Sequence, residues 1–368
     1  MNLDFRFAII SDLHIALPHT VWDHPNRIHW VEISIPALEV ILERLSQLPL
    51  DFLLLPGDLT QHGEPENHAW LAGRLTKLPY PAFVIPGNHD LPQTLGETAA
   101  IAPGDFSRLY RAFGYNDSHQ LYYTQQVLPG VRLIGLNSIG FDSAGNQVGR
   151  VDDTQLQWLK TVLAESSHDL NLVMIHHNIV EHLPNQAKHP LAKRYLLENA
   201  AELCTVLQQG GVQLVFTGHL HIQDIAFSHG LYDITTGSLI SYPHPYRLLH
   251  YFTNQQHWLT IASERVEAVP GWTRLQQRSR RYLERRSPLF LRQLLTHPPL
   301  NLSPAEAEAL IPDLRNFWSA IASGDAIFHF PHFPTAIRQY FEQYSALNQE
   351  GQPQLIDNHT TLLLKNHQ

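Results

Sequence analysis

Up to about residue 220, short apolar runs alternate along the chain with longer amphipathic segments. Six of these runs are too short for helices, and most are bounded by Gly, Pro, Asn or Asp, which indicates buried strands. They lie at residues 5–10, 52–55, 82–85, 131–136, 172–175 and 213–216. Apolar residues at helical spacing predict helices over 31–48, 66–78 and 152–165. The alternation is typical of an α/β domain built from βαβ units.

The pattern changes after residue 222, where short β-like pieces separated by turn residues continue to residue 262. We expect an antiparallel meander there, either as a second sheet or as a continuation of the first. Further on, Ser303 and Glu306 have the spacing of an N-cap and its capping box. The sequence therefore predicts a main domain over 1–262 and a mainly helical extension over 263–368. We expect Pro312 and Gly324 to divide the extension into several helices, and the tail after about residue 347 to be loosely held.

Composition restricts the class of protein. Apolar residues make up 43% of the chain and charged residues 16%, with a formal net charge of −9. These values exclude disorder driven by charge repulsion and a basic surface over the whole chain. The single cysteine, Cys204, excludes an intrachain disulfide framework and most thiolate metal sites. No apolar run reaches the roughly 18 residues of a membrane span, and Asp4 and Arg6 interrupt any signal-peptide pattern. We expect a cytoplasmic protein.

One segment departs from the acidic balance, because residues 265–292 hold eight arginines against two glutamates. Such a segment could contact nucleic-acid phosphates or an anionic membrane surface. We favour an amphipathic helix that docks on the acidic main domain or pairs with a second copy of the chain. Nucleic acid is therefore not an expected partner, and a homo-oligomer stays open.

Five of the predicted strands are followed immediately by polar residues of types that bind metals. In chain order, the strand ends lead to Asp12 and His14, to Gly57 and Asp58, to Gly87-Asn88-His89-Asp90, to His176 and His177, and to Gly218, His219 and His221. The carboxyl ends of strands gather along one edge of an α/β sheet, so five such ends can converge on one site. Each motif alone is more often a structural turn, but five together are hard to produce by chance.

The residue types indicate the chemistry of this site. Carboxylate, imidazole and amide groups without thiolate suit Mn, Fe or Zn. There are enough ligands for two ions, and one carboxylate can bridge a pair about 3.5–4 Å apart. Glycines before the ligands let the backbone turn sharply and approach closely. We therefore predict a centre for two divalent or trivalent metal ions.

The order and spacing of these motifs resemble those of a known family. Asp12-Leu13-His14, Gly57-Asp58, Gly87-Asn88-His89-Asp90, His176 and Gly218-His219-Leu220-His221 resemble the signature of the calcineurin-like metallophosphoesterases. Residues 56–63, a helix, and residues 84–90 are similar to the class III cyclic-nucleotide phosphodiesterase branch. The resemblance covers about residues 4–262. It implies an αββα sandwich of two mixed sheets flanked by helices, with the C-terminal helices as an appendage.

The resemblance also implies a role for each motif residue. One metal would be held by Asp12, His14 and His221 and the other by Asn88, His176 and His219, with Asp58 as the bridge. We favour His176 over His177 because the predicted strand ends there. His89 would lie over the substrate and donate to a phosphoryl oxygen or the leaving alkoxide, and Asp90 would orient it.

The implied reaction is hydrolysis of a phosphodiester by attack of a metal-bound hydroxide. The favoured substrate is a 3',5'-cyclic nucleotide or another small phosphodiester. A phosphomonoesterase or glycerophosphodiesterase of the same fold is the alternative. A non-catalytic scaffold is less favoured, because no motif ligand is missing. Segments 17–30 and 241–246 are candidate lips of the site, and we expect His19, His24 and His29 to be solvated loop residues.

Overall fold

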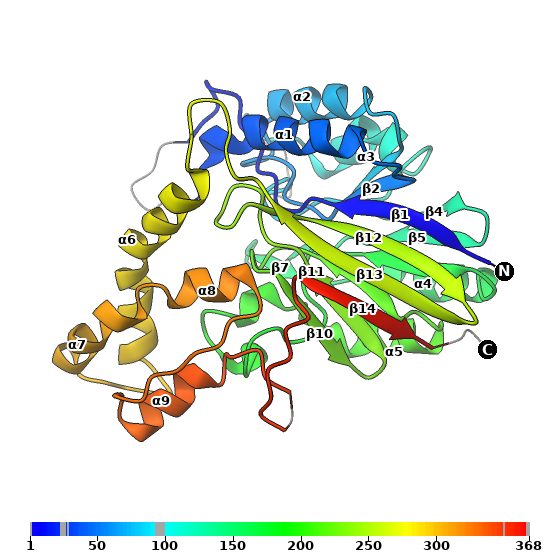
Figure 1. Cartoon of the computed structure of the whole chain (residues 1–368). Helices are drawn as coiled ribbons and strands as arrows, with labels where there is room; N and C mark the ends of the chain where they lie inside the picture. Colours follow the sequence, from blue (N-terminus) through cyan, green and yellow to red (C-terminus); the bar gives the residue numbers. More distant parts are fainter. Residues whose placement is uncertain (1, 23–26, 28, 93–99, 349, 366–368) are drawn as a thin grey trace.

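The computed structural model describes residues 2–22, 27, 29–92, 100–348 and 350–365, and in this part of the chain two six-stranded sheets lie face to face (Figure 1). In spatial order, the first sheet consists of β14 (His359–Leu364), β13 (Gln256–Arg265), β12 (Pro245–Asn254), β1 (Asp4–Ile9), β2 (Phe52–Leu55) and β3 (Ala82–Val84). The second consists of β10 (Asp224–Ser228), β11 (Leu231–Thr235), β9 (Leu214–Thr217), β8 (Leu170–Met174), β5 (Val131–Gly135) and β4 (Tyr123–Leu128). A small hairpin, β6 (Ile139–Phe141) and β7 (Gln147–Gly149), stands apart from both.

All six strands predicted from short apolar runs are confirmed. β1, β2 and β3 are parallel neighbours in the first sheet, and β5, β8 and β9 are parallel neighbours in the second. The sheets pack on each other through aromatic side chains. Phe7 stacks on Phe52 at 4.9 Å within the first sheet and meets the edge of Phe216 in the second at 5.4 Å between ring centroids. The two sheets therefore share one core between their facing sides.

Helices cover the outer faces of the sheets (Figure 1). α1 (Ser34–Ser46), α2 (Pro65–Leu75) and α3 (Pro103–Leu109) lie beside the first sheet, and α4 (Asp153–Glu165) and α5 (Ala200–Gln209) beside the second. Short 3-10 turns occur at η1 (Val31–Ile33), η2 (Arg111–Phe113), η3 (Gln186–Lys188) and η4 (Lys193–Tyr195). The three predicted helices correspond to η1 with α1, to α2 and to α4, which confirms the mixed α/β architecture.

The segment after residue 222 does not form the single meander that its pattern predicted. β10 and β11 join the second sheet, where β11 pairs in parallel with β9. β12 and β13 instead join the first sheet, where β12 pairs antiparallel with β1. The spacing of apolar residues identified the strands, but the placement of β12 in the first sheet depends on pairing with β1, more than 200 residues away.

The C-terminal region consists mainly of four helices, whose core also includes main-domain residues such as Leu220. The helices are α6 (Leu275–Thr296), α7 (Pro304–Leu314), α8 (Phe317–Ser323) and α9 (Thr335–Glu342). Leu291, Leu314, Phe317 and Phe341 are buried in this core. The capping box of Ser303 and Glu306 at the start of α7 is confirmed.

The tail was expected to be loosely held, and this prediction is wrong. After α9 the chain returns to the main domain, and β14 pairs antiparallel with β13 at the edge of the first sheet. Two reciprocal hydrogen bonds hold the returning chain to the loop after α8. Asp325 N donates to Asp357 Oδ2 at 2.7 Å, and Asp357 N donates to Asp325 Oδ1 at 2.9 Å. Pro312 lies inside α7, only two residues before that helix ends, so it does not separate helices.

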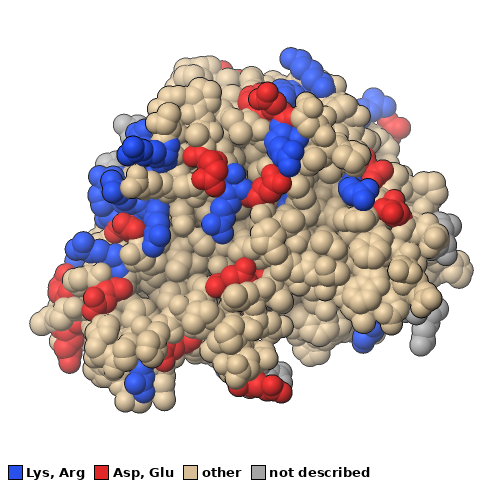
Figure 2. All heavy atoms as spheres, viewed as in Figure 1, with Lys and Arg blue, Asp and Glu red and all other residues tan. Residues whose placement is uncertain are grey.

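Most of the arginine-rich segment forms α6, and this helix docks on the main domain as expected, with Leu275 buried in the main core and Tyr282 donating to Arg27 O. Its arginines do not make this contact. Arg274, Arg278, Arg281 and Arg285 recur at a spacing of three and four residues and are exposed. Among the described residues, no carboxylate lies within 4.0 Å of any of these four guanidinium groups. Figure 2 shows Lys and Arg side chains gathered on the side of the molecule where α6 lies. Further along α6, Leu291 is buried in the core of the C-terminal helices.

A membrane-spanning helix is not found in the described part of the chain, because no helix there is both long and apolar enough.

Candidate metal centre

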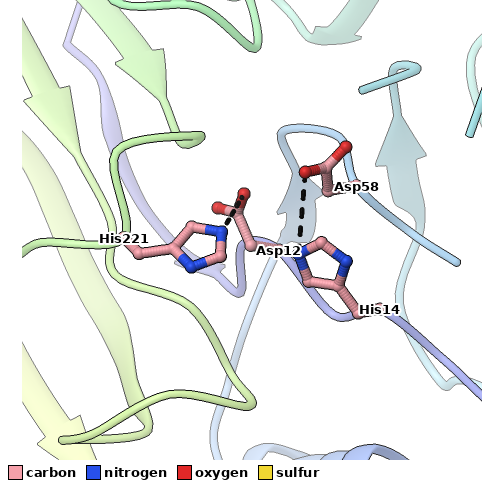
Figure 3. Close-up of side chains that lie close together, drawn as sticks. All are labelled: Asp12, His14, Asp58 and His221. Atoms are coloured by element: carbon pink, nitrogen blue, oxygen red, sulfur yellow. Dashed lines mark ion pairs between the residues drawn. The ribbon is translucent and has the colours of Figure 1, made fainter. Parts of the chain in front are cut away.

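Loops that follow β1, β2, β8 and β9 bring carboxylates and imidazoles together at one edge of the two sheets. Four residues form one group whose potential ligand atoms lie within 4.8 Å of one another: Asp12, His14, Asp58 and His221 (Figure 3). A second group consists of Asp58, His176 and His219. Asp58 belongs to both groups, which is the arrangement expected of a carboxylate that bridges two metals.

The backbone at these residues is strained. Five non-glycine residues have positive φ angles: Asp12 (50°), His14 (44°), Asp58 (50°), His219 (66°) and His221 (59°). This left-handed conformation is uncommon for residues with a Cβ, and such strain concentrates at functional sites where the surrounding structure enforces it. Here His14 N donates to Asp58 O at 2.9 Å, so the two loops hold each other in place.

Two glycines are required by the closeness of these loops. A Cβ on Gly87 would lie 2.2 Å from Asp58 N and from Asp58 Oδ1. A Cβ on Gly218 would lie 2.2 Å from Ser11 Oγ and 2.5 Å from Asp12 Oδ2. Because real Cβ atoms do not approach so closely, any side chain at either position would displace an acidic residue of the site.

The first group fits a metal ion well. His221 Nε2 lies 3.2 Å from Asp12 Oδ1, and His14 Nε2 lies 3.6 Å from Asp58 Oδ2. His14 Nε2 is buried and has no hydrogen-bond partner. Burial together with the nearby His89 holds the pKa of His14 well below its usual value. A buried, neutral imidazole nitrogen that points between carboxylates without a hydrogen bond is suited to ligate a cation.

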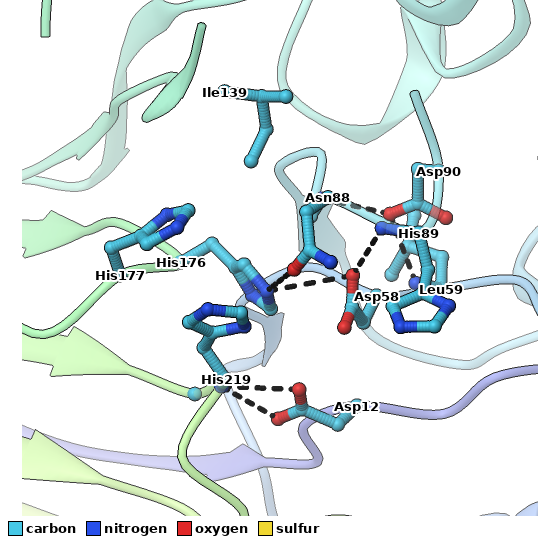
Figure 4. A network of polar contacts seen from close by, with 12 residues as sticks. Asp12, Asp58, Leu59, Asn88, His89, Asp90, Ile139, His176, His177 and His219 are labelled. Carbon is cyan, nitrogen blue, oxygen red and sulfur yellow. Dashed lines mark hydrogen bonds and ion pairs between the residues drawn. The ribbon is translucent and has the colours of Figure 1, made fainter. Parts of the chain in front are cut away.

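Figure 4 shows the residues of the second group, Asp58, His176 and His219, together with Asn88. His176 Nε2 lies 3.4 Å from Asp58 Oδ1 and 3.1 Å from Asn88 Oδ1. Its Nδ1 donates to Pro56 O at 2.8 Å, which turns Nε2 towards the carboxylate. Burial opposes a charge on His176, but the Asp58 carboxylate prevails and raises the pKa of His176 to about 9. The amide oxygen of Asn88 lies beside these two groups, where it is available as a neutral ligand.

The neighbouring His177 has different contacts. Its Nδ1 lies 2.8 Å from Ser138 Oγ, and burial lowers the pKa of His177 to about 3. Its ring packs 4.3 Å from that of His219 between centroids, but it belongs to neither group of candidate ligands. The geometry therefore favours His176 as the ligand.

His89 faces the site without joining either group. Its ring meets that of His14 edge-on at 4.6 Å, and its backbone N donates to Asp58 Oδ1 at 2.8 Å. Nδ1 of His89 donates to Gln61 O at 2.7 Å, so Nε2 is the nitrogen left for a substrate. The side chain lines the cavity above the metal groups, which fits a role over the phosphoryl group.

The expectation that Asp90 orients His89 is corrected, since the Gln61 carbonyl does so. The Asp90 carboxylate is fully buried and accepts hydrogen bonds from the backbone N atoms of Gly87, Leu59 and Thr60 at 2.8–3.0 Å. Burial and the neighbouring Asp58 raise the pKa of Asp90 to about 7. Asp90 thus joins the loop after β2 to the loop after β3 and positions the residues on both (Figure 4).

One histidine expected to be solvated lines the site instead. His29 Nδ1 lies 2.8 Å from Ser241 Oγ, and its ring is 4.7 Å from that of His221 between centroids. Segments 17–30 and 241–246 therefore meet at the rim, as their assignment as lips predicted. His19 is exposed and pairs with Glu66. His24 falls outside the described residues.

The metal groups open into a cavity of about 690 Å³. Its wall includes Lys193, Arg194 and Tyr195 of η4, and also Leu283 and Trp318 of the C-terminal helices. The sequence motifs do not point to these residues, because loop and appendage positions have no regular spacing relative to the strand ends.

Known proteins share this sequence pattern and fold. The family model described as calcineurin-like phosphoesterase matches residues 5–223. A probable cyclic nucleotide phosphodiesterase of Synechococcus sp. is 30% identical over 220 residues, covering 60% of this chain and 74% of that protein. A 3',5'-cyclic-nucleotide phosphodiesterase of Nostoc sp. is 26% identical over 223 residues, covering 60% and 73%. The crystal structure of a dimetal phosphatase from Danio rerio covers 71% of this chain and 96% of its own, with a TM-score of 0.52 and 15% identity.

The family match spans more than half of the chain and contains all five motif loops. The similar solved structure supports the two-sheet fold. The chain therefore belongs to the calcineurin-like phosphoesterase family.

Proposed function

We propose that this protein is a dinuclear-metal phosphodiesterase whose substrate is a 3',5'-cyclic nucleotide or another small phosphodiester. The observation that carries the proposal is that Asp58 belongs to two adjacent groups of ligand residues. The names of the Synechococcus and Nostoc relatives support the cyclic-nucleotide substrate. Asp12, His14 and His221 would hold one ion, and Asn88, His176 and His219 the other. Mn, Fe or Zn suits these ligands.

Two ions at these positions would act as Lewis acids towards the phosphoryl oxygens and lower the pKa of bound water. The protein fixes the geometry of the centre through Asp90, which joins two of the ligand loops. His89 acts on the substrate itself. Since its Nδ1–H is committed to Gln61 O, it is the second proton of the imidazolium form, on Nε2, that His89 would donate to a phosphoryl oxygen or to the leaving alkoxide.

A hydrolysis panel tests the proposal. Purified protein is assayed with 3',5'-cyclic AMP, bis-p-nitrophenyl phosphate, p-nitrophenyl phosphate and a glycerophosphodiester, each with Mn, Zn, Fe and Mg. We expect metal-dependent hydrolysis of the diesters, with the cyclic nucleotide preferred. If only monoesters were hydrolysed, the protein would be a phosphomonoesterase and the proposal would be wrong. A preference for the glycerol ester would instead indicate a glycerophosphodiesterase. No metal-dependent turnover of any ester would contradict catalysis altogether.

A further inference from the structure

The C-terminal helices contribute a wall to the candidate active site, although they lie outside the family match, which ends at residue 223. Leu283 on α6, and Trp318 and Ala322 on α8, line the same cavity as Asp58, Asn88 and His219. The extension is therefore part of the site.

This wall is apolar. The side chains of Leu283 and Trp318 are half-buried, and Trp318 packs on Phe290 with ring centroids 5.5 Å apart. Tyr195 of η4 lines the same cavity, with its ring 4.9 Å from that of the candidate ligand His219. The cavity thus offers metal ligands at one place and apolar and aromatic side chains at another, the usual pattern of a site that positions a small ligand by a few polar contacts.

The wall is fixed relative to the metal ligands. Leu220, between the candidate ligands His219 and His221, is buried in the core of the C-terminal helices together with Phe317. Gln223 N also donates to Ala322 O at 3.1 Å. The ligand loop and α8 therefore share one packed unit, which sets the distance from the centre to the wall.

We propose that this wall binds the organic part of the substrate and selects an aromatic base over a glycerol group. This inference rests on the proposed function and specifies the substrate class. A base buries apolar ring surface against Leu283 and Trp318, whereas glycerol hydroxyls placed there would lose water without gaining hydrogen bonds. The cavity of about 690 Å³ has the size usual for ligands as large as a nucleotide.

Calorimetry with 5'-AMP and glycerol 3-phosphate, in the presence of Mn, tests the inference without requiring turnover. We expect the wild-type protein to bind AMP about tenfold more tightly. Leu283→Ala and Trp318→Ala each abolish most of that preference. The matched control is Leu289→Ala on the same helix, because Leu289 is 67% exposed and does not line the cavity. We expect the Leu289 variant to keep the wild-type preference for AMP over glycerol 3-phosphate.

The KM and kcat for 3',5'-cyclic AMP complete the test. We expect KM to rise about tenfold in the two wall variants, with kcat and the melting temperature close to wild type. A wild type without preference for AMP, or wall variants that retain it, would overturn the inference even if diesters are hydrolysed. An AMP preference that depends on the wall, in a protein that hydrolyses no diester, would instead uphold the inference and refute the proposed function.

Discussion

Nε2 of His14 and Oδ2 of Asp58 face each other 3.6 Å apart, both buried, and no hydrogen bond joins them. This distance is too long for a hydrogen bond and leaves the imidazole nitrogen without a partner in the protein. A buried polar atom without a hydrogen-bond partner is costly. The pair therefore favours a cation between these atoms, with Asp58 also serving the group of His176 and His219.

Replacement of Asp58 by alanine tests this bridging role. The change removes the carboxylate common to both groups, so we expect at least one ion to be lost and kcat to fall by about a thousandfold or more. Metal content by plasma emission and turnover of bis-p-nitrophenyl phosphate measure the two effects. Asp117→Asn is the control, because Asp117 is exposed and pairs with Arg111 at the surface. Wild-type turnover in the Asp58 variant would refute the metal assignment.

His89→Ala separates proton donation from metal binding. Since His89 belongs to neither group of ligands, we expect both ions to remain. The loss of the Nε2 donor should lower kcat by about 10²–10⁴-fold, with the largest effect on esters whose leaving alkoxides are most basic. A series of aryl and alkyl phosphodiesters gives this dependence. If metal content fell with activity, His89 would have to be a ligand.

A pair of glycine substitutions tests how closely the loops must approach. Gly218→Ala places a Cβ 2.5 Å from Asp12 Oδ2, so we expect weaker metal binding and reduced turnover. Gly73→Ala is the matched control, because a Cβ at this position in α2 would meet no heavy atom of the described residues within 4 Å beyond its chain neighbours and its own helix backbone. There the change should stabilise the protein by about 0.5–1 kcal/mol, as alanine favours the helix. Calorimetric titration with Mn and urea denaturation measure both outcomes, and equal metal affinity in the two variants would contradict this explanation.

The sequence predicted the parts of the site that local chemistry determines. Short apolar runs that end at Asp12, Asp58 or Asn88 define both a strand and a ligand position, because a parallel strand presents its carboxyl end at a common edge. The preference for His176 over His177 followed from where the strand ends, and the geometry agrees with it. These inferences needed no knowledge of distant contacts.

The remaining features depend on contacts between segments far apart in the chain. Nothing near Asp90 reveals that its carboxylate receives the backbone N–H groups of Leu59 and Thr60. The pairing of β14 with β13, and the placement of Leu283 and Trp318 in the cavity, result from how the C-terminal helices pack as a unit. The local spacing of residues does not reflect such packing. The tail after residue 347 was therefore predicted to be loose, and the cavity wall of Leu283 and Trp318 was not predicted.

A buried histidine next to the metal loops gives the protein a pH-dependent stability. Nδ1 of His182 donates to Asp224 Oδ2 at 2.6 Å, and Nε2 lies 3.3 Å from Asp233 Oδ1. Burial opposes the charge of the ring, but Asp233 and Asp224 raise the pKa of His182 to about 10. Asp233 Oδ2 also accepts hydrogen bonds from the backbone N atoms of Ile179 and Val180, just after His176. The imidazolium therefore supports the loop that follows a candidate ligand.

Because the pKa of His182 is higher in the folded state than the roughly 6.5 of an unfolded histidine, its charge stabilises the fold. That contribution is complete below about pH 6.5 and is lost as the pH rises through about 10. We expect His182→Asn to lower the free energy of unfolding by about 3 kcal/mol at pH 6, and the difference from wild type to shrink between pH 8 and 10.5. Urea denaturation across this range measures it, with exposed His119→Asn as the control. A loss that stays constant with pH would show that the ring acts through packing, since only a charged ring loses its contribution when the proton leaves.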